Sequence, residues 1–184
     1  MLRNTVDSWG TLAKLLHWLI ALLVFGQLAL GWAAVLWRLS PLKLDLFVLH
    51  KSFGLVVLVL MLPRLLWRLL NPTPVLPAAM PRWQRQAARA SHGLLYLLLL
   101  LLPLSGWVLS SAADIPFRMF WLWPLPALVA PDEAVEDAAA TLHLVLVVLL
   151  GLVLSAHVGA ALWHHYRLRD EVLVRMLPGR TRKR

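Results

Sequence analysis

Apolar residues dominate four long stretches of the chain, at residues 12–36, 46–70, 92–111 and 138–163. A helix that crosses a bilayer needs about 20 predominantly apolar residues, and each stretch is long enough. The pattern therefore predicts four membrane-spanning helices. We expect an all-α fold, an integral membrane four-helix bundle that forms a single domain over residues 1–184.

The first apolar stretch could be mistaken for a signal peptide. It is longer than the roughly 7–15 apolar residues of such a signal, and no small-residue cleavage motif follows it. We expect this stretch to remain in the protein as a spanning helix.

Proline residues mark the connection between the second and third stretches, with four of them between residues 72 and 81. Proline removes a helical hydrogen bond, so this connection is not helical throughout. Arg82, Arg85 and Arg89 then recur at helical spacing, which predicts a short surface helix that binds anionic lipid.

The connection between the third and fourth stretches, residues 112–137, is aromatic first and acidic afterwards. Aromatic side chains are favoured at the membrane–water interface, so we expect this connection on the outer membrane surface. Pro131 and Asp132 are typical of a helix start, and acidic residues follow in the first turn. The fourth helix is therefore expected to begin before it enters the hydrocarbon.

The charge distribution predicts how the chain is oriented in the membrane. The chain is 60% hydrophobic, with a mean hydropathy of +0.73 and a formal net charge of +9. Most basic residues belong to the two ends and the second connection, and they are Arg3, Lys14, Arg64, Arg68, Arg82, Arg85, Arg89, Arg167, Arg169, Arg175, Arg180, Arg182, Lys183 and Arg184. Only Arg38, Lys43, Lys51 and Arg118 belong to the first and third connections. The positive-inside rule then predicts that both termini are cytoplasmic, and lipid rather than nucleic acid accounts for the charge.

Two histidines inside the fourth apolar stretch are the first candidate functional residues. The chain has no cysteine, which excludes disulfides, thiolate ligation of haem and covalent c-type haem attachment. His143 and His157 are 14 positions apart, so they share one side of the helix and are separated by roughly 21 Å along its axis. A polar side chain in hydrocarbon usually faces the bundle interior, which makes each a candidate functional residue.

His17 and His50 supply partners for these two histidines. His17 stands early in the first helix, on the cytoplasmic side, and His50 stands early in the second helix, on the outer side. The fourth helix runs from outside to inside, so the rise per residue predicts equal depths for two pairs. We expect His50 with His143 outside, and His17 with His157 inside.

Facing imidazoles can ligate haem iron axially, and four-helix cores often hold such sites. Zinc is the competing metal, but it usually takes three or four ligands near one point, whereas these histidines form two distant pairs. The pattern therefore favours two haem b groups. Gly54, one turn after His50, either admits a flat macrocycle or serves helix packing.

Three further histidines have open roles. His92 opens the third helix, either as an interfacial residue or as a proton or quinone contact. His164 and His165 are adjacent, so their side chains point about 100° apart and at most one faces the core.

Five segments carry a resemblance to a known family. They are LLHWLIALLVF around His17, LHKSFGLVVLVLMLPRLLWRLLNPTP from residue 49, SHGLLYLLLLLLPLSGW from residue 91, TLHLVLVVLLGLVLSAHVGAALWHHY in the fourth helix, and the tail LVRMLPGRTRKR. In combination they resemble the bacterial cytochrome b561 family, small di-haem membrane cytochromes. The resemblance implies haem iron ligands at His17, His50, His143 and His157.

The resemblance also implies an activity. We expect a di-haem b oxidoreductase of the bacterial inner membrane that moves electrons from an external donor such as superoxide to ubiquinone. Histidine fills both axial positions, so each haem is expected to relay electrons rather than bind oxygen. One alternative is a haem-bearing anchor or cytochrome subunit that serves a partner redox protein. Another is a haem-free transporter that uses its histidines as proton relays.

Lys51 and Arg118 are the candidates for attracting the donor. They are among the few cations of the outward connections, and a basic cleft raises the local concentration of a small anion. We expect them to steer superoxide toward the outer haem; the alternative role is pairing with lipid phosphate.

Overall fold

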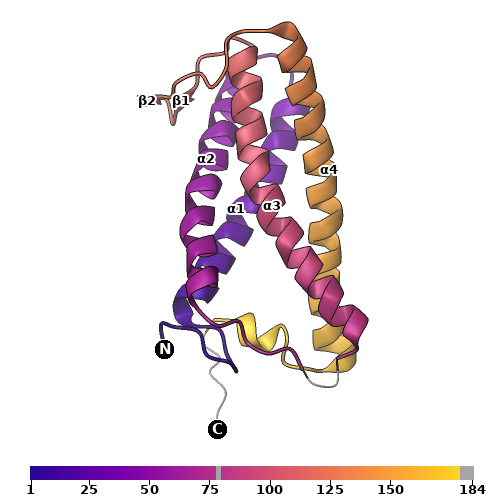
Figure 1. Cartoon of the computed structure of the whole chain (residues 1–184). Coiled ribbons are helices and arrows are strands. Elements are labelled where there is room, and N and C mark those ends of the chain that lie inside the picture. Colours follow the sequence, from indigo (N-terminus) through magenta and orange to yellow (C-terminus); the bar gives the residue numbers. More distant parts are fainter. Residues whose placement is uncertain (78–79, 179–184) are drawn as a thin grey trace. The chain divides into compact units, whose positions relative to one another are not determined.

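Helices make up most of the protein, whose computed structural model describes residues 1–77 and 80–178 (Figure 1). The long helices are α1 (Thr11–Leu36), α2 (Pro41–Leu70), α3 (Arg82–Ala112) and α4 (Glu133–Trp163). Smaller elements are the antiparallel strands β1 (Arg118–Met119) and β2 (Trp123–Pro124), the π-helix η1 (His164–Leu168) and the 3₁₀-helix η2 (Val174–Met176). The prediction of four long apolar helices is confirmed.

Three of the four long helices begin at least 5 residues earlier in the sequence than predicted. α1 and α2 end where the apolar pattern predicts, whereas α2, α3 and α4 begin 5, 10 and 5 residues earlier than residues 46, 92 and 138. The predicted start of α4 is confirmed, because the Val135 amide donates to Oδ1 of Asp132 at 3.0 Å. An aspartate in this position caps the free amides of the first turn.

The prediction of a separate surface helix at Arg82, Arg85 and Arg89 is wrong. These residues form the first turns of α3, which continues without interruption to Ala112. No glycine or proline occurs between residues 82 and 92, and the segment consists mostly of good helix formers. Helix propagation therefore carries through to the span.

Most side chains of the four helices face outward from the protein. In the most apolar window of each helix, at most 17% of the residues are buried, although leucine and valine predominate there. A water-soluble protein rarely exposes so much contiguous apolar surface. Each helix is long and apolar enough to cross a membrane, so these faces contact lipid.

The chain divides into two compact units. Unit 1 comprises Met1–Leu19, Leu62–Leu97 and Leu150–Arg184, and unit 2 comprises Ile20–Met61 and Leu98–Leu149. Each unit therefore takes a segment of all four long helices. The basic residues Arg180, Arg182, Lys183 and Arg184, which contributed to the predicted topology, lie outside the described residues.

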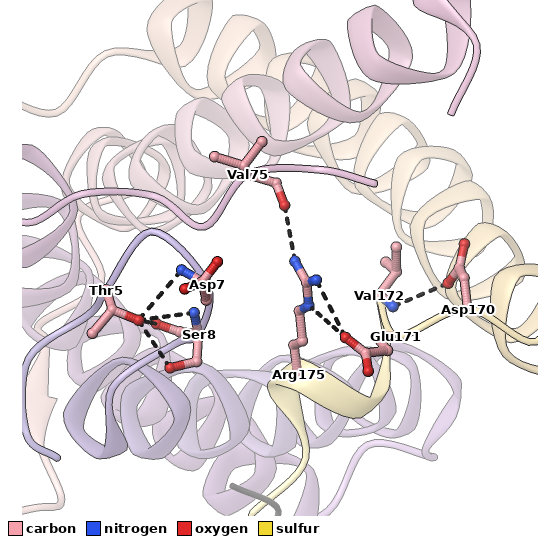
Figure 2. Close-up of polar contacts among 8 residues, drawn as sticks. All are labelled: Thr5, Asp7, Ser8, Val75, Asp170, Glu171, Val172 and Arg175. Atoms are coloured by element: carbon pink, nitrogen blue, oxygen red, sulfur yellow. Dashed lines mark hydrogen bonds and ion pairs between the residues drawn. The ribbon is translucent and has the colours of Figure 1, made fainter. Parts of the chain in front are cut away.

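Hydrogen bonds connect three segments of unit 1 that are distant in the sequence. The Val75 amide donates to the Val6 carbonyl at 2.8 Å, and the Arg175 guanidinium donates to the Val75 carbonyl at 2.9 Å. Figure 2 shows Arg175 between Val75 and Glu171, and it also shows the turn that Thr5 forms with Asp7 and Ser8. The amino-terminal segment, the second connection and the carboxyl-terminal segment consequently lie together.

In unit 2, the third connection is fastened to α2 next to His50. Oγ of Ser52 is fully buried and accepts a hydrogen bond from the Phe120 amide at 2.8 Å. The Phe120 ring also packs edge-on against Phe53, with 5.1 Å between ring centroids. These contacts fix the β1–β2 turn on the residues that follow His50.

Candidate cofactor site: two histidine pairs

Unit 1 contains a pair of facing histidines. The rings of His17 on α1 and His157 on α4 have centroids 6.4 Å apart and planes inclined at 67°. A third ring, that of His92 on α3, lies 5.3 Å from His157. The sequence left the role of His92 open and gave no sign of this contact, because His92 stands near the start of the apolar stretch.

Unit 2 contains a second pair with the same spacing. His50 on α2 and His143 on α4 also have ring centroids 6.4 Å apart, with planes inclined at 82°. The structure thus brings together the same two pairs that helix direction and rise predict. Neither unit draws on a histidine of the other for its pair.

The spacing of both pairs suits a single metal ion bound between two imidazoles. A metal–nitrogen bond of ~2 Å on each side of the ion separates the ring centroids by roughly 6 Å. Over residues 1–77 and 80–178, no group of three or more His, Cys, Asp or Glu side chains is arranged to hold a metal ion. The donor set therefore fits two axial ligands of a haem better than a zinc site.

Two glycines leave space beside the rings of unit 2. A Cβ added at Gly31 on α1 would approach Cε1 of His50 to 2.9 Å, and one at Gly106 on α3 would approach Cε1 of His143 to 3.3 Å. At Gly54, a Cβ would meet only Nε2 of Gln27 at 3.7 Å, an ordinary contact. Gly31 and Gly106, which the sequence did not single out, are the glycines that leave room for the ligand side chains.

The backbone carbonyl of His50 accepts a hydrogen bond, whereas one of its ring nitrogens has no partner among the described residues. Nε2 of Gln27 donates to the His50 carbonyl at 2.9 Å, which joins α1 to α2. Nδ1 of His50 is buried and has no hydrogen-bond partner among the described residues. A buried polar atom without a partner is costly, so a group bound at this nitrogen would offset that cost.

Unit 1 differs in carrying positive charge at its pair. Nη2 of Arg64 on α2 lies 3.1 Å from Nδ1 of His17, and the guanidinium groups of Arg64 and Arg68 lie 5.7 and 5.3 Å from the ring of Tyr96. Neither arginine forms an ion pair with an acidic side chain in the part of the chain that the structure describes. The site therefore suits an anionic group, such as the carboxylates of a haem.

The Arg64 contact also fixes the proton on His17. A guanidinium only donates, so Nδ1 of His17 accepts this bond and the ring proton is on Nε2. A metal that binds Nε2 of the neutral ring would require the proton to move to Nδ1, which could then no longer accept a hydrogen bond from Arg64. Sequence reasoning used Arg64 only as a topology signal, although an arginine within an apolar helix is itself a sign of function.

The remaining histidines lie in different surroundings. His164 is buried, and its Nδ1 pairs with Oδ2 of Asp170. His165 is only half-buried, and its ring packs against Tyr166. The prediction that at most one of these neighbours faces the interior is confirmed.

The two candidate steering residues both belong to unit 2. Nζ of Lys51, which follows His50, lies 5.8 Å from the centre of the Phe117 ring. Arg118 is exposed on β1, directly after Phe117. The structure therefore places the Lys51 side chain against the start of the strand that carries Arg118.

Comparison with known proteins agrees with these features. The sequence profile of the family described as prokaryotic cytochrome b561 matches residues 8–179. "Cytochrome b561 homolog 2" of Escherichia coli K12 is 36% identical over 180 residues, which are 95% of this chain and 93% of that protein. "Probable superoxide oxidase CybB" of Yersinia pestis is 32% identical over 89% of this chain and 92% of its own length. "Cytochrome b561 homolog 1" of Escherichia coli K12 is 33% identical, over 90% and 94% respectively.

Proposed function

Because this chain belongs to the prokaryotic cytochrome b561 family, a family of haem b electron-transfer proteins of the membrane, we propose that it holds two haem b groups. His17 and His157 ligate the iron of one, and His50 and His143 ligate the iron of the other. The observation that carries the proposal is the pair of identical 6.4 Å spacings, one in each compact unit.

The ligand set determines what the protein can do. When bound, haem supplies reversible one-electron chemistry. Each histidine pair would supply two imidazole ligands to a bound haem iron, and this ligand set would favour outer-sphere electron transfer over oxygen binding. Arg64 and Arg68 would provide positive charge that adjusts the reduction potential in unit 1.

The proposed reaction is oxidation of superoxide by ubiquinone. Two superoxide ions each lose one electron and leave as oxygen, while one ubiquinone gains two electrons and two protons to become ubiquinol. Support comes from the name of the Yersinia pestis relative and from two cations of unit 2: Lys51, which follows His50 in the sequence, and Arg118, which follows the Phe117 ring that Lys51 contacts. Lys51 and Arg118 attract the superoxide anion, because positive charge raises the local concentration of anions.

We further propose the orientation of the chain. The amino-terminal segment, the second connection and the carboxyl-terminal segment contact one another and carry most of the basic residues, so they face the cytoplasm of a bacterial inner membrane. The first and third connections, which belong to unit 2, face the outside, where superoxide arrives.

The test is spectroscopy of the purified protein with donor and acceptor supplied in turn. We expect b-type absorption bands, about two haems per chain, reduction by superoxide and reoxidation by a short-chain ubiquinone with formation of quinol. Absence of haem would contradict the cytochrome assignment and favour the proton-relay transporter. Haem that superoxide does not reduce would contradict the superoxide reaction and favour a cytochrome subunit that serves a partner enzyme.

A further inference from the structure

A buried hydroxyl on α3 contacts the ring of His143 in unit 2. Ser105 is only 6% exposed. Its Oγ lies 2.8 Å from the Leu102 carbonyl oxygen, one turn earlier on the same helix, and 2.8 Å from Nδ1 of His143. Both distances are those of good hydrogen bonds.

The two contacts together fix where each proton is. A serine hydroxyl has one proton, and a carbonyl oxygen can only accept, so Ser105 donates to Leu102. Nδ1 of His143 must then donate to Oγ of Ser105. The reverse assignment would leave two oxygen atoms 2.8 Å apart with no proton between them. A neutral imidazole has only one N–H, so Nε2 of His143 retains its lone pair, which is the form that binds a metal.

The ring nitrogen away from the metal meets opposite surroundings in the two units. In unit 2 it donates to an oxygen acceptor, whereas Nδ1 of His17 in unit 1 faces the guanidinium of Arg64. A hydrogen bond from the ring to an acceptor makes the imidazole a stronger electron donor to a metal, and this favours the oxidised ion. A nearby cation favours the reduced ion instead.

We propose that Ser105 is a positioning residue that holds His143 with Nε2 free for iron and lowers the reduction potential of the unit 2 haem. This inference rests on the proposed function, in which His143 is an axial ligand. Lys51 and Arg118 also belong to unit 2. A lower reduction potential there favours release of the electron from the haem whose unit carries both proposed steering residues.

The experiment is a redox titration of three variants, monitored by absorption and by electron paramagnetic resonance. Ser105→Ala removes the hydroxyl acceptor, Ser105→Thr retains a hydroxyl, and Ser110→Ala removes a hydroxyl on the same helix that donates to the Gly106 carbonyl at 3.0 Å. The unit 2 haem is identified as the component missing from His143→Ala protein.

We expect Ser105→Ala to shift the oxidised/reduced equilibrium of that haem about tenfold toward the reduced form, which is about 59 mV for one electron. Its resonance signals change, while Ser105→Thr and Ser110→Ala retain the wild-type values. Loss of that haem in Ser105→Ala with recovery in Ser105→Thr supports the inference equally.

The inference is overturned if Ser105→Ala retains two haems with unchanged potentials and resonance signals. It is also overturned if Ser110→Ala has the same effect as Ser105→Ala, since the cause would then be helix packing. Wild-type protein without two haems would instead refute the proposed function, so the two failures are distinguishable.

Discussion

At the scale of single residues, the room beside each imidazole matters as much as the imidazole itself. Gly31 faces Cε1 of His50 so closely that a Cβ would lie 2.9 Å from it, a separation that carbon atoms do not tolerate. An alanine here would move the His50 ring unless α1 itself shifted. The glycine therefore sets the orientation of a proposed ligand without touching the metal.

We predict that Gly31→Ala lowers the affinity of unit 2 for haem at least about tenfold, because displacement of a ligand has effects of that size. The matched control is Gly26→Ala on the same helix, where a Cβ would meet nothing within 4 Å. Alanine is the better helix former, so neither change weakens α1 locally. Haem content per chain, measured by absorption after reconstitution, checks the prediction, and two fully occupied haems in Gly31→Ala would contradict it.

At the scale of elements, the β1–β2 turn is held in a conformation that its residues do not favour. Phe120 and Trp121 have φ values of 48° and 63°, in the left-handed region, where a bulky residue costs on the order of 1–3 kcal/mol. The hydrogen bond from the Phe120 amide to Ser52 and the packing on Phe53 offset that cost. The turn thereby keeps the third connection, with its exposed Arg118, on the helix that carries His50.

We predict that the double variant Lys51→Gln, Arg118→Gln lowers the rate constant for reduction by superoxide about tenfold at low ionic strength, because it removes two cations near the proposed entry point. The rate should also become nearly independent of salt. Rapid-mixing kinetics at two ionic strengths measure both effects.

The control for this prediction is Arg38→Gln with Lys43→Gln, which removes the same charge from the connection between α1 and α2 and from the first turn of α2, in the same unit. This variant should keep more of the wild-type rate. Equal rates and equal salt dependence in wild type and in the Lys51, Arg118 variant would exclude steering by these residues.

At the scale of the whole molecule, one pair of histidines belongs to each compact unit. Each long helix contributes a segment to both units, and α4 supplies one histidine to each. In the proposed arrangement, each haem would be held by two helical segments of a single unit.

Much of this arrangement could be predicted from the sequence, for identifiable physical reasons. Apolar length determines how many helices span, and helix direction with a fixed rise determines which histidines share a depth, so His17 matches His157 and His50 matches His143. Contacts that depend on helix rotation could not be predicted. α1 is apolar on all sides, so its pattern does not indicate that Gly31 faces His50. The position of Ser105 in α3 likewise gave no sign that its hydroxyl contacts His143.

The sequence also did not predict that α3 is one continuous helix from Arg82 to Ala112. The arginines that precede the third span suggested a separate helix, because charge implied a change of environment at the membrane surface. Backbone propensity decided otherwise, and α3 begins at Arg82. The sequence predicted which histidines lie together better than it predicted where α3 begins.

The most direct test of the two-pair account is haem content and redox titration of four variants, His17→Ala, His157→Ala, His50→Ala and His143→Ala, with His165→Ala as the control. The account predicts that His17→Ala and His157→Ala lose the same haem, that His50→Ala and His143→Ala lose the other, and that His165→Ala retains both. Loss of one and the same haem on replacing His17 and His143 would contradict the account.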